Sequence, residues 1–241
     1  MISCKKHEQP YGASEDRLQP KPIEHKAQNS TNEHRKAEEK KENPKEAMLD
    51  VPLISQNPEL KYGCEVTSLT MVLHYAGIQV DKMKLANELP KDSDPVKKIS
   101  GDIQSWGNPD HGFVGDITGK KMGYAVYAKP LEQLMRKYLP DQTVNLTGKS
   151  MDDVFSQITK GKPVVVWTTG DYKQPDRWET WKHGNEEIHT PLDLHAVVLV
   201  GFDPDYVYIN DPLTGKKAHK VERKMFIRTW EIMGKQALTY N

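Results

Sequence analysis

Cys64 stands at the predicted start of a helix, where a thiol can act as a nucleophile. From Glu65 to Ala76 apolar side chains recur at intervals of three and four residues, which predicts an amphipathic helix. The free amides and partial positive charge of a helix N-terminus favour a thiolate and lower the pKa of a cysteine. A lone cysteine is more often a small buried apolar residue. Cys64 is therefore a catalytic candidate only if a base lies near it.

His195 is the candidate base among the nine histidines. It opens the apolar run HAVVLVGF, which predicts a buried strand, and rigid strands often present polar side chains to active sites at their ends. Three histidines lie in a charged N-terminal segment, and His74 would lie roughly 15 Å from Cys64 at 1.5 Å per helical residue. Four more lie in polar, loop-like stretches: His111, His183, His189 and His219. A half-exposed histidine at a strand edge is the alternative for His195.

Two late strands are predicted to form a hairpin. The run YVYIND (206–211) follows the first strand (195–202), with Asp203-Pro204-Asp205 as the turn. With that turn, Phe202 opposes Tyr206.

The same register places Asp211 beside His195. Val197 then opposes Asp211, and because side chains alternate between faces, His195 and Asp211 share a face. As diagonal neighbours they lie roughly 7–8 Å apart at the backbone, within side-chain reach. A one-residue bulge would bring Asn210 to the imidazole instead. An acid on the imidazole would fix its tautomer and orient it toward a thiol.

Gln56 lies eight positions before Cys64, in a loop that leads to the predicted helix. Its amide, together with the backbone N–H of Cys64, would make a two-donor oxyanion hole. A glutamine in a loop is most often solvated, so this residue would not be singled out by itself.

The elements that must position these residues indicate an α+β fold. Helices are predicted over 65–76, 82–89, 131–139 and 151–160, and strands over 163–168, 195–202 and 206–211. Residues 91–128 are rich in Gly, Pro, Asn and Asp, which predicts loops. The N-terminal helices are expected to pack on the C-terminal antiparallel sheet.

Composition excludes several classes of protein. The 241 residues hold 34 Lys and Arg against 34 Asp and Glu, so the net charge of zero argues against a nucleic-acid binder. No run approaches the roughly 18 apolar residues of a transmembrane span. With only two cysteines, Cys4 and Cys64, the chain has neither a disulfide framework nor a cysteine-based zinc site.

The chain divides into a charged arm (1–47) and a folded domain (48–241). The arm has few apolar residues and is expected to be flexible. Its start, MISCKK, resembles the end of a bacterial lipoprotein signal without the preceding apolar stretch. A lipid anchor at Cys4 and an incidental cysteine both stay open. The first implies an extracellular or cell-envelope location, whereas the second leaves a cytoplasmic one open.

Other polar and aromatic clusters point to no cofactor. The stretch HGNEEIHTPLDLH (183–195) holds three histidines among acidic residues, but the HExxH spacing is missing, so we predict no metal site and a polar loop beside the cleft. Four tryptophans either line a substrate groove or belong to the core: Trp106, Trp167, Trp178 and Trp181.

Four segments together resemble the bacterial peptidase C39-like family, within the papain-like cysteine peptidases. They are QNPELKYGCEVTSLTMVL, WGNPDHGFVG, GKPVVVWTT and LHAVVLVGFD…VYINDP. The resemblance covers about Leu49 to the C-terminus and implies a papain-like fold. It also implies Cys64 as nucleophile, His195 as general base, Asp211 as orienting acid and Gln56 as oxyanion donor.

Two departures limit this resemblance. The bacteriocin-processing members are fused to a transporter, and their gap between Gln and Cys is shorter than the one here. Processing of double-glycine leader peptides is therefore not implied. The expected activity is hydrolysis of peptide bonds in a peptide or protein substrate by a monomer. An acyltransferase on the same triad, or a papain-like domain that only binds peptides, remains as an alternative.

Deleting residues 1–45 should leave the melting temperature almost unchanged, because so polar a segment buries little apolar area. Thermal unfolding followed by circular dichroism checks this. A drop of several degrees would show that the arm packs on the domain.

Overall fold

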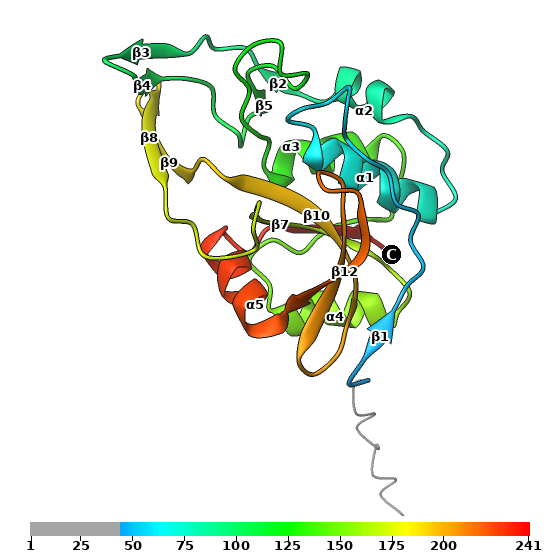
Figure 1. Ribbon diagram of the computed structural model, residues 1–241. Coiled ribbons are helices and arrows are strands. Elements are labelled where there is room, and N and C mark those ends of the chain that lie inside the picture. The colour runs from blue at the N-terminus through cyan, green and yellow to red at the C-terminus, as the bar shows by residue number, and fades with distance from the viewer. Residues whose placement is uncertain (1–43) are drawn as a thin grey trace, which may run out of the picture. The chain divides into compact units, whose positions relative to one another are not determined.

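The computed structural model describes residues 44–241 (Figure 1). The predicted arm lies outside the described residues apart from its last four, and so does Cys4. Ala47, the last residue assigned to the arm, already pairs with Phe202 in the central sheet.

The described part of the chain contains five helices and thirteen strands. The helices are α1 (Cys64–Tyr75), α2 (Lys82–Glu88), α3 (Ala128–Arg136), α4 (Met151–Thr159) and α5 (Arg223–Ile232). The strands of the central sheet are β1 (Ala47–Met48), β6 (Thr143–Asn145), β7 (Val164–Thr169), β10 (Leu194–Phe202), β11 (Tyr206–Asp211), β12 (Lys216–Glu222) and β13 (Ala237–Tyr240). The peripheral strands are β2 (Lys91–Asp92), β3 (Lys97–Ile99), β4 (Asp102–Ser105), β5 (Phe113–Val114), β8 (Trp178–His183) and β9 (Glu186–Pro191).

The central sheet is antiparallel and has the order β12-β11-β10-β7-β13-β6, with β1 on β10. Every residue of β7 is buried, as are all residues of β10 after Leu194. These two strands are runs of β-branched and other apolar residues, which suits strands covered on both faces. His195 therefore stands on a strand that is buried along nearly its whole length.

Helices cover both faces of the sheet (Figure 1). The apolar side chains of α1, α2 and α3 form one cluster with Val165, Ala196 and Val198. Those of α4 and α5 form a second cluster with Val166 and Val197, on the opposite face. The α+β class and the antiparallel sheet are confirmed. The layer on the second face, including α5, was not predicted.

The predicted polar loop over residues 183–195 is wrong. Residues 178–191 form the hairpin β8–β9, which closes at Gly184-Asn185 with Gly184 at a φ of 58°. Glycine followed by asparagine is a two-residue hairpin signal, and polar side chains alternate along both strands. The hairpin joins β3 and β4 in a small sheet beside the main one (Figure 1).

Local sequence determines where two of the helices begin. Gly63 is the residue before α1, and a Cβ atom there would lie 2.5 Å from the Cβ of buried Leu60, so this close turn requires glycine. At α4, Ser150 and Asp153 form the reciprocal capping box that their spacing predicts. No helix among residues 44–241 is long and apolar enough to cross a membrane.

Candidate active site

The register of the β10–β11 hairpin decides which acid meets His195. The turn closes between Asp203 and Tyr206, so Phe202 pairs with Val207 rather than with Tyr206 as predicted. An irregularity between Leu199 and Gly201 then shifts the register by one residue. Past this bulge Val198 pairs with Asn210. This is the same register as the predicted pairing of Val197 with Asp211. The predicted pairing is therefore off by one residue at the turn, but it agrees with the structure beyond the bulge, where the site lies.

Asp211 is hydrogen-bonded to the imidazole of His195, with Nε2 2.8 Å from Oδ1. The other carboxylate oxygen, Oδ2, accepts hydrogen bonds from the hydroxyls of Tyr172 and Thr214, each at 2.6 Å. Burial by itself raises the pKa of Asp211, but the hydrogen bonds from His195, Thr214 and Tyr172 outweigh it and leave that pKa well below its usual range. Asp211 is therefore ionised and can only accept a hydrogen bond, so Nε2 of His195 must carry the proton of this bond.

Asn210 points away from this pair. Its side-chain amide donates to the carbonyl of Val51, and its oxygen accepts from the backbone of Ala218. It anchors the chain that leads from β1 toward Gln56.

Cys64 is the first residue of α1, the helix that packs on β10. The backbone of Ala196, the residue after His195, lies near enough to the Cys64 thiol to lower its pKa. The same helix is held to β10 one turn further on, where the hydroxyl of Ser68 donates to the carbonyl of Ala196. The helix N-terminus and the start of β10 are thereby brought together, with Cys64 7% exposed and His195 3% exposed.

Glu65 is a fully buried carboxyl group that sequence reasoning did not single out. Its Oε1 accepts the backbone N–H of Val126 at 2.9 Å, and the Cys64 thiol donates to its Oε2 at 3.3 Å. Burial raises the pKa of Glu65 to about 7. A glutamate in the first turn of a helix is ordinarily an exposed residue whose charge complements the helix dipole, so the sequence gives no sign that Glu65 is buried.

The expectation that the helix N-terminus lowers the pKa of Cys64 is wrong for these surroundings. Burial raises the pKa of the thiol well above its usual value, and the adjacent Glu65 carboxylate adds to the rise. The backbone of Ala196 acts in the opposite sense but is the smaller effect. Desolvation and a neighbouring negative charge both disfavour a thiolate, so the resting sulfur is a protonated thiol.

Gln56 is 2% exposed and is not a solvated loop residue. Its Nε2 donates to the carbonyl of Lys61 at 2.9 Å, and its Oε1 has no hydrogen-bond partner within the described structure. Its backbone N–H donates to the carbonyl of Pro212, next to Asp211. Two turns, closed by bonds from Leu60 to Gln56 and from Gly63 to Leu60, take up the eight-residue gap to Cys64.

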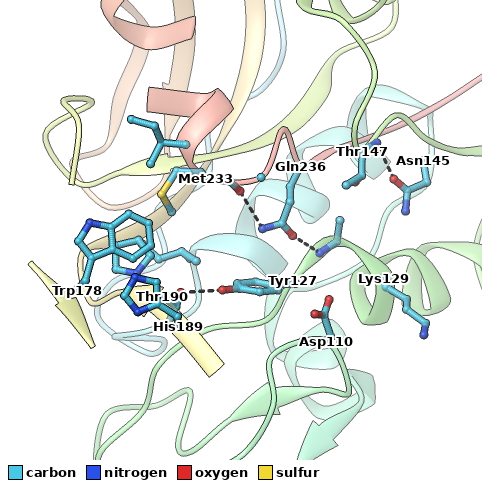
Figure 2. Close-up of a pocket in the computed structure, with 15 residues that line it drawn as sticks. Asp110, Tyr127, Lys129, Asn145, Thr147, Trp178, His189, Thr190, Met233 and Gln236 are labelled. Atoms are coloured by element: carbon cyan, nitrogen blue, oxygen red, sulfur yellow. Dashed lines mark hydrogen bonds between the residues drawn. The ribbon is translucent and has the colours of Figure 1, made fainter. Parts of the chain in front are cut away.

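A pocket of about 350 Å³ lies at the start of β10 (Figure 2). It is lined on one side by Trp178, His189 and Thr190 of the β8–β9 hairpin, and Leu194, which precedes His195, also lines it. The Tyr127 hydroxyl is bonded to Thr190 across the floor (Figure 2). None of Cys64, His195, Asp211 and Gln56 lines the pocket itself. Of the four tryptophans considered for a groove, only Trp178 contributes, because the other three are core residues: Trp106, Trp167 and Trp181.

Comparison with known proteins identifies the family. The family model described as "Peptidase_C39 like family" matches residues 48–238. The chain belongs to the peptidase C39-like family. The uncharacterized protein YvpB of Bacillus subtilis (strain 168) is 43% identical over 192 residues, which cover 79% of this chain and 74% of YvpB.

Solved structures agree with this assignment. A crystal structure provisionally titled as a C39-like peptidase from Bacillus anthracis is 45% identical, with a TM-score of 0.76 over 82% of this chain and 98% of that one. A prointerpain A fragment from Prevotella intermedia is 14% identical, with a TM-score of 0.38 over 80% of this chain and 71% of that one, and we draw nothing from it. This chain therefore has the fold of the peptidase C39-like family.

Changing Glu65 to Gln in this C39-like protein should alter how stability depends on pH. A folded-state pKa raised from 4.5 to about 7 makes the native state lose stability as pH rises through that window. At 1.36 kcal/mol per pKa unit, the stability of Glu65→Gln relative to wild type should grow by about 3 kcal/mol between pH 4.5 and pH 8.

Urea unfolding at the two pH values measures this difference. Glu187→Gln, which changes an exposed glutamate of the β8–β9 hairpin, controls for loss of a carboxylate in general. Equal pH profiles for wild type and Glu65→Gln would show that Glu65 does not titrate in this range.

Proposed function

We propose that this protein is a cysteine peptidase in which Cys64, His195 and Asp211 form the catalytic triad and Gln56 completes the oxyanion hole. The observation that supports this most is the 2.8 Å bond between His195 and Asp211, formed at the start of the strand on which the helix of Cys64 packs. Family membership supports the reaction class.

The tautomer of His195 suits a general base. Because Nε2 carries the proton bonded to the ionised Asp211, Nδ1 of the neutral ring is an acceptor. Nδ1 takes the proton of the buried Cys64 thiol as the sulfur attacks the carbonyl carbon of the substrate. His195 then returns that proton to the leaving amine, and a thioester forms at Cys64. Water, deprotonated by His195, hydrolyses the thioester and releases the thiol.

The raised pKa of the thiol makes this proton transfer part of the mechanism. A thiol that is neutral at rest gains its nucleophilicity only as His195 accepts its proton. Asp211 stabilises the imidazolium that forms, and Tyr172 and Thr214 hold the carboxylate in place.

Negative charge on the substrate oxygen needs two donors. The N–H of Cys64 lies in the first turn of α1, where amides have no carbonyl partner within the helix. The second donor is the Gln56 amide, which has two protons and uses one of them on Lys61. The pocket beside Leu194 would accept an apolar side chain of a bound peptide, because Trp178, Ile232 and Met233 line it.

Variants of Asp211 should separate its role in orienting the His195 ring from the role of its negative charge. In Asp211→Asn the amide oxygen can still accept from Nε2, and the hydroxyls of Tyr172 and Thr214 can turn to accept from the amide nitrogen. We expect peptide or ester turnover to stay within about tenfold for Asp211→Asn and to fall by about 10²-fold or more for Asp211→Ala.

The measurements are turnover and the rate of Cys64 alkylation by iodoacetamide, located by peptide mapping. His195→Ala should abolish turnover and slow the labelling of Cys64 at pH 7, whereas Cys4→Ser should change neither. Full turnover in Cys64→Ala or His195→Ala would contradict the proposal. Competition between water and an added primary amine separates hydrolysis from acyl transfer, because an acyltransferase would form mainly the amide product and a peptidase mainly the acid.

Gln56→Ala should lower kcat about 10²–10³-fold with little change in KM, since its second proton acts on charge that develops in the transition state. Alkylation of Cys64 should persist, because that reaction needs no oxyanion donor. Thermal unfolding of the same variant reports the separate loss of the buried bond to Lys61. A variant with normal kcat would remove Gln56 from the site.

A further inference from the structure

Three potential metal ligands meet at the side of the molecule where the peripheral sheet joins the body. Asp92 is the last residue of β2, His111 lies in the turn before β5, and His183 ends β8. One ligand atom from each lies within 4.8 Å of the other two. Because these residues are far apart in the chain, only the tertiary fold assembles this cluster.

The Asp92 carboxylate is held in place at the centre of the cluster. Its Oδ2 accepts the backbone N–H of Asn108 at 3.0 Å, and its Oδ1 accepts that of Asp94 at 3.1 Å. The same Oδ2 lies 3.1 Å from Nε2 of His183 and 3.9 Å from Nδ1 of His111. The side chain is only 8% exposed.

A further carboxylate faces the other side of the His183 ring. The other ring nitrogen, Nδ1, faces Oε2 of Glu186 at 3.7 Å, and the Asn108 amide donates to that same oxygen at 2.8 Å. A carboxylate on the far nitrogen is the usual outer partner of a metal-binding histidine, where it sets the tautomer. Asn108, 5% exposed, thus contacts both Asp92 and Glu186, and its carbonyl also accepts the N–H of His111.

The backbone around the cluster leaves space for the Asp92 carboxylate. A Cβ atom at Gly107 would lie 2.9 Å from the Asp92 carboxylate carbon, so this turn closes around Asp92 only because residue 107 is glycine.

We propose that Asp92, His111 and His183 bind a divalent zinc-type cation, with Asp94 or a water molecule as fourth ligand. Two imidazoles and a carboxylate suit Zn²⁺, whereas Mg²⁺ and Ca²⁺ prefer oxygen ligands throughout. Ligand atoms at about 2.0–2.1 Å from a tetrahedral zinc lie about 3.3 Å apart. The 3.1 Å and 3.9 Å separations on Asp92 therefore need adjustments of less than an ångström. Oδ2 of Asp94 lies 3.4 Å from Nε2 of His183, which puts it within reach of the same ion.

Charge supports a cation over a simple hydrogen bond between His183 and Asp92. Asp92, Asp94 and Glu186 surround His183 with three carboxylates, so the cluster is negative whenever its imidazoles are neutral. A divalent ion would offset two of these three negative charges. The histidine-rich stretch 183–195 contains only His183 of these ligands, and because Asp92 and His111 lie outside it, its sequence does not indicate the site.

The ion would tie the β8–β9 hairpin to the loop that follows β4. That hairpin supplies Trp178, His189 and Thr190 to the pocket next to Leu194. Zinc would therefore hold one wall of the pocket in place, and this structural role does not depend on catalysis at Cys64.

Zinc content and stability of the full chain test the proposal. After removal of metal with a chelator and dialysis against Zn²⁺, the wild type should retain one equivalent by elemental analysis. Zn²⁺ at about a hundred times its Kd should raise the melting temperature by about 5–10 °C, and Ca²⁺ should not. Hydrogen exchange of residues 178–191 should slow when zinc is present.

Matched variants locate the ion. His111→Gln and His183→Gln should each lose the bound zinc and the zinc-dependent rise in melting temperature. His25→Gln, outside the described residues, should keep both. His111 is half exposed, so its variant should fold, and the metal-free melting temperature of each variant verifies this. The proposal is overturned if wild type and the double variant His111→Gln/His183→Gln hold equal zinc, if His25→Gln loses it, or if Ca²⁺ stabilises as well as Zn²⁺.

Discussion

The hydrogen bond between His195 and Asp211 is the interaction on which the candidate active site depends. It forms inside the central sheet, where His195 is 3% exposed and Asp211 is fully buried, so neither side chain can turn to solvent. The bond exists because a bulge in β10, between Leu199 and Gly201, shifts the pairing of β10 with β11 by one residue before the strands reach the site. A bulge of this kind shifts one strand against its neighbour and thereby re-aims the side chains beyond it.

The rest of the site is assembled on the same two strands. The helix that begins at Cys64 is bonded to Ala196 through the Ser68 hydroxyl, and the Gln56 backbone is bonded to Pro212, so both residues are positioned relative to the ends of β10 and β11. Glu65 completes the arrangement by linking the start of α1 to Val126. Placing a carboxyl beside a buried thiol disfavours the thiolate, so the proposed mechanism assigns the activation of Cys64 to the base rather than to the helix dipole.

The peripheral sheet gives the molecule an additional surface beside this rigid centre. Its strands β8 and β9 are largely exposed, but Trp181 is buried and its indole N–H donates to the carbonyl of Gly107. That contact and the cluster around Asp92 hold the hairpin against the loop after β4. The pocket wall that includes Trp178 therefore depends on packing remote from Cys64.

Much of this protein follows from its sequence because the signals are local. Helix α1, the buried strands β7 and β10, and the capping box at Ser150 appear as periodic patterns or short motifs. Cys64, His195, Asp211 and Gln56 could be selected as candidates because their residue types and their places at the ends of elements are visible in the sequence. The hairpin at residues 178–191 was also encoded, by Gly184-Asn185 and alternating polarity, although we predicted a loop.

Tertiary structure alone decided the electrostatics and the long-range contacts. No pattern shows that Glu65 is buried, that Tyr172 and Thr214 hold Asp211, or that Asp92 meets His183. The pKa of Cys64 depends on desolvation and on a neighbouring charge, and both are properties of the assembled interior. Periodicity reports which face of an element is apolar, whereas burial and the identity of a polar partner depend on which elements pack against that face.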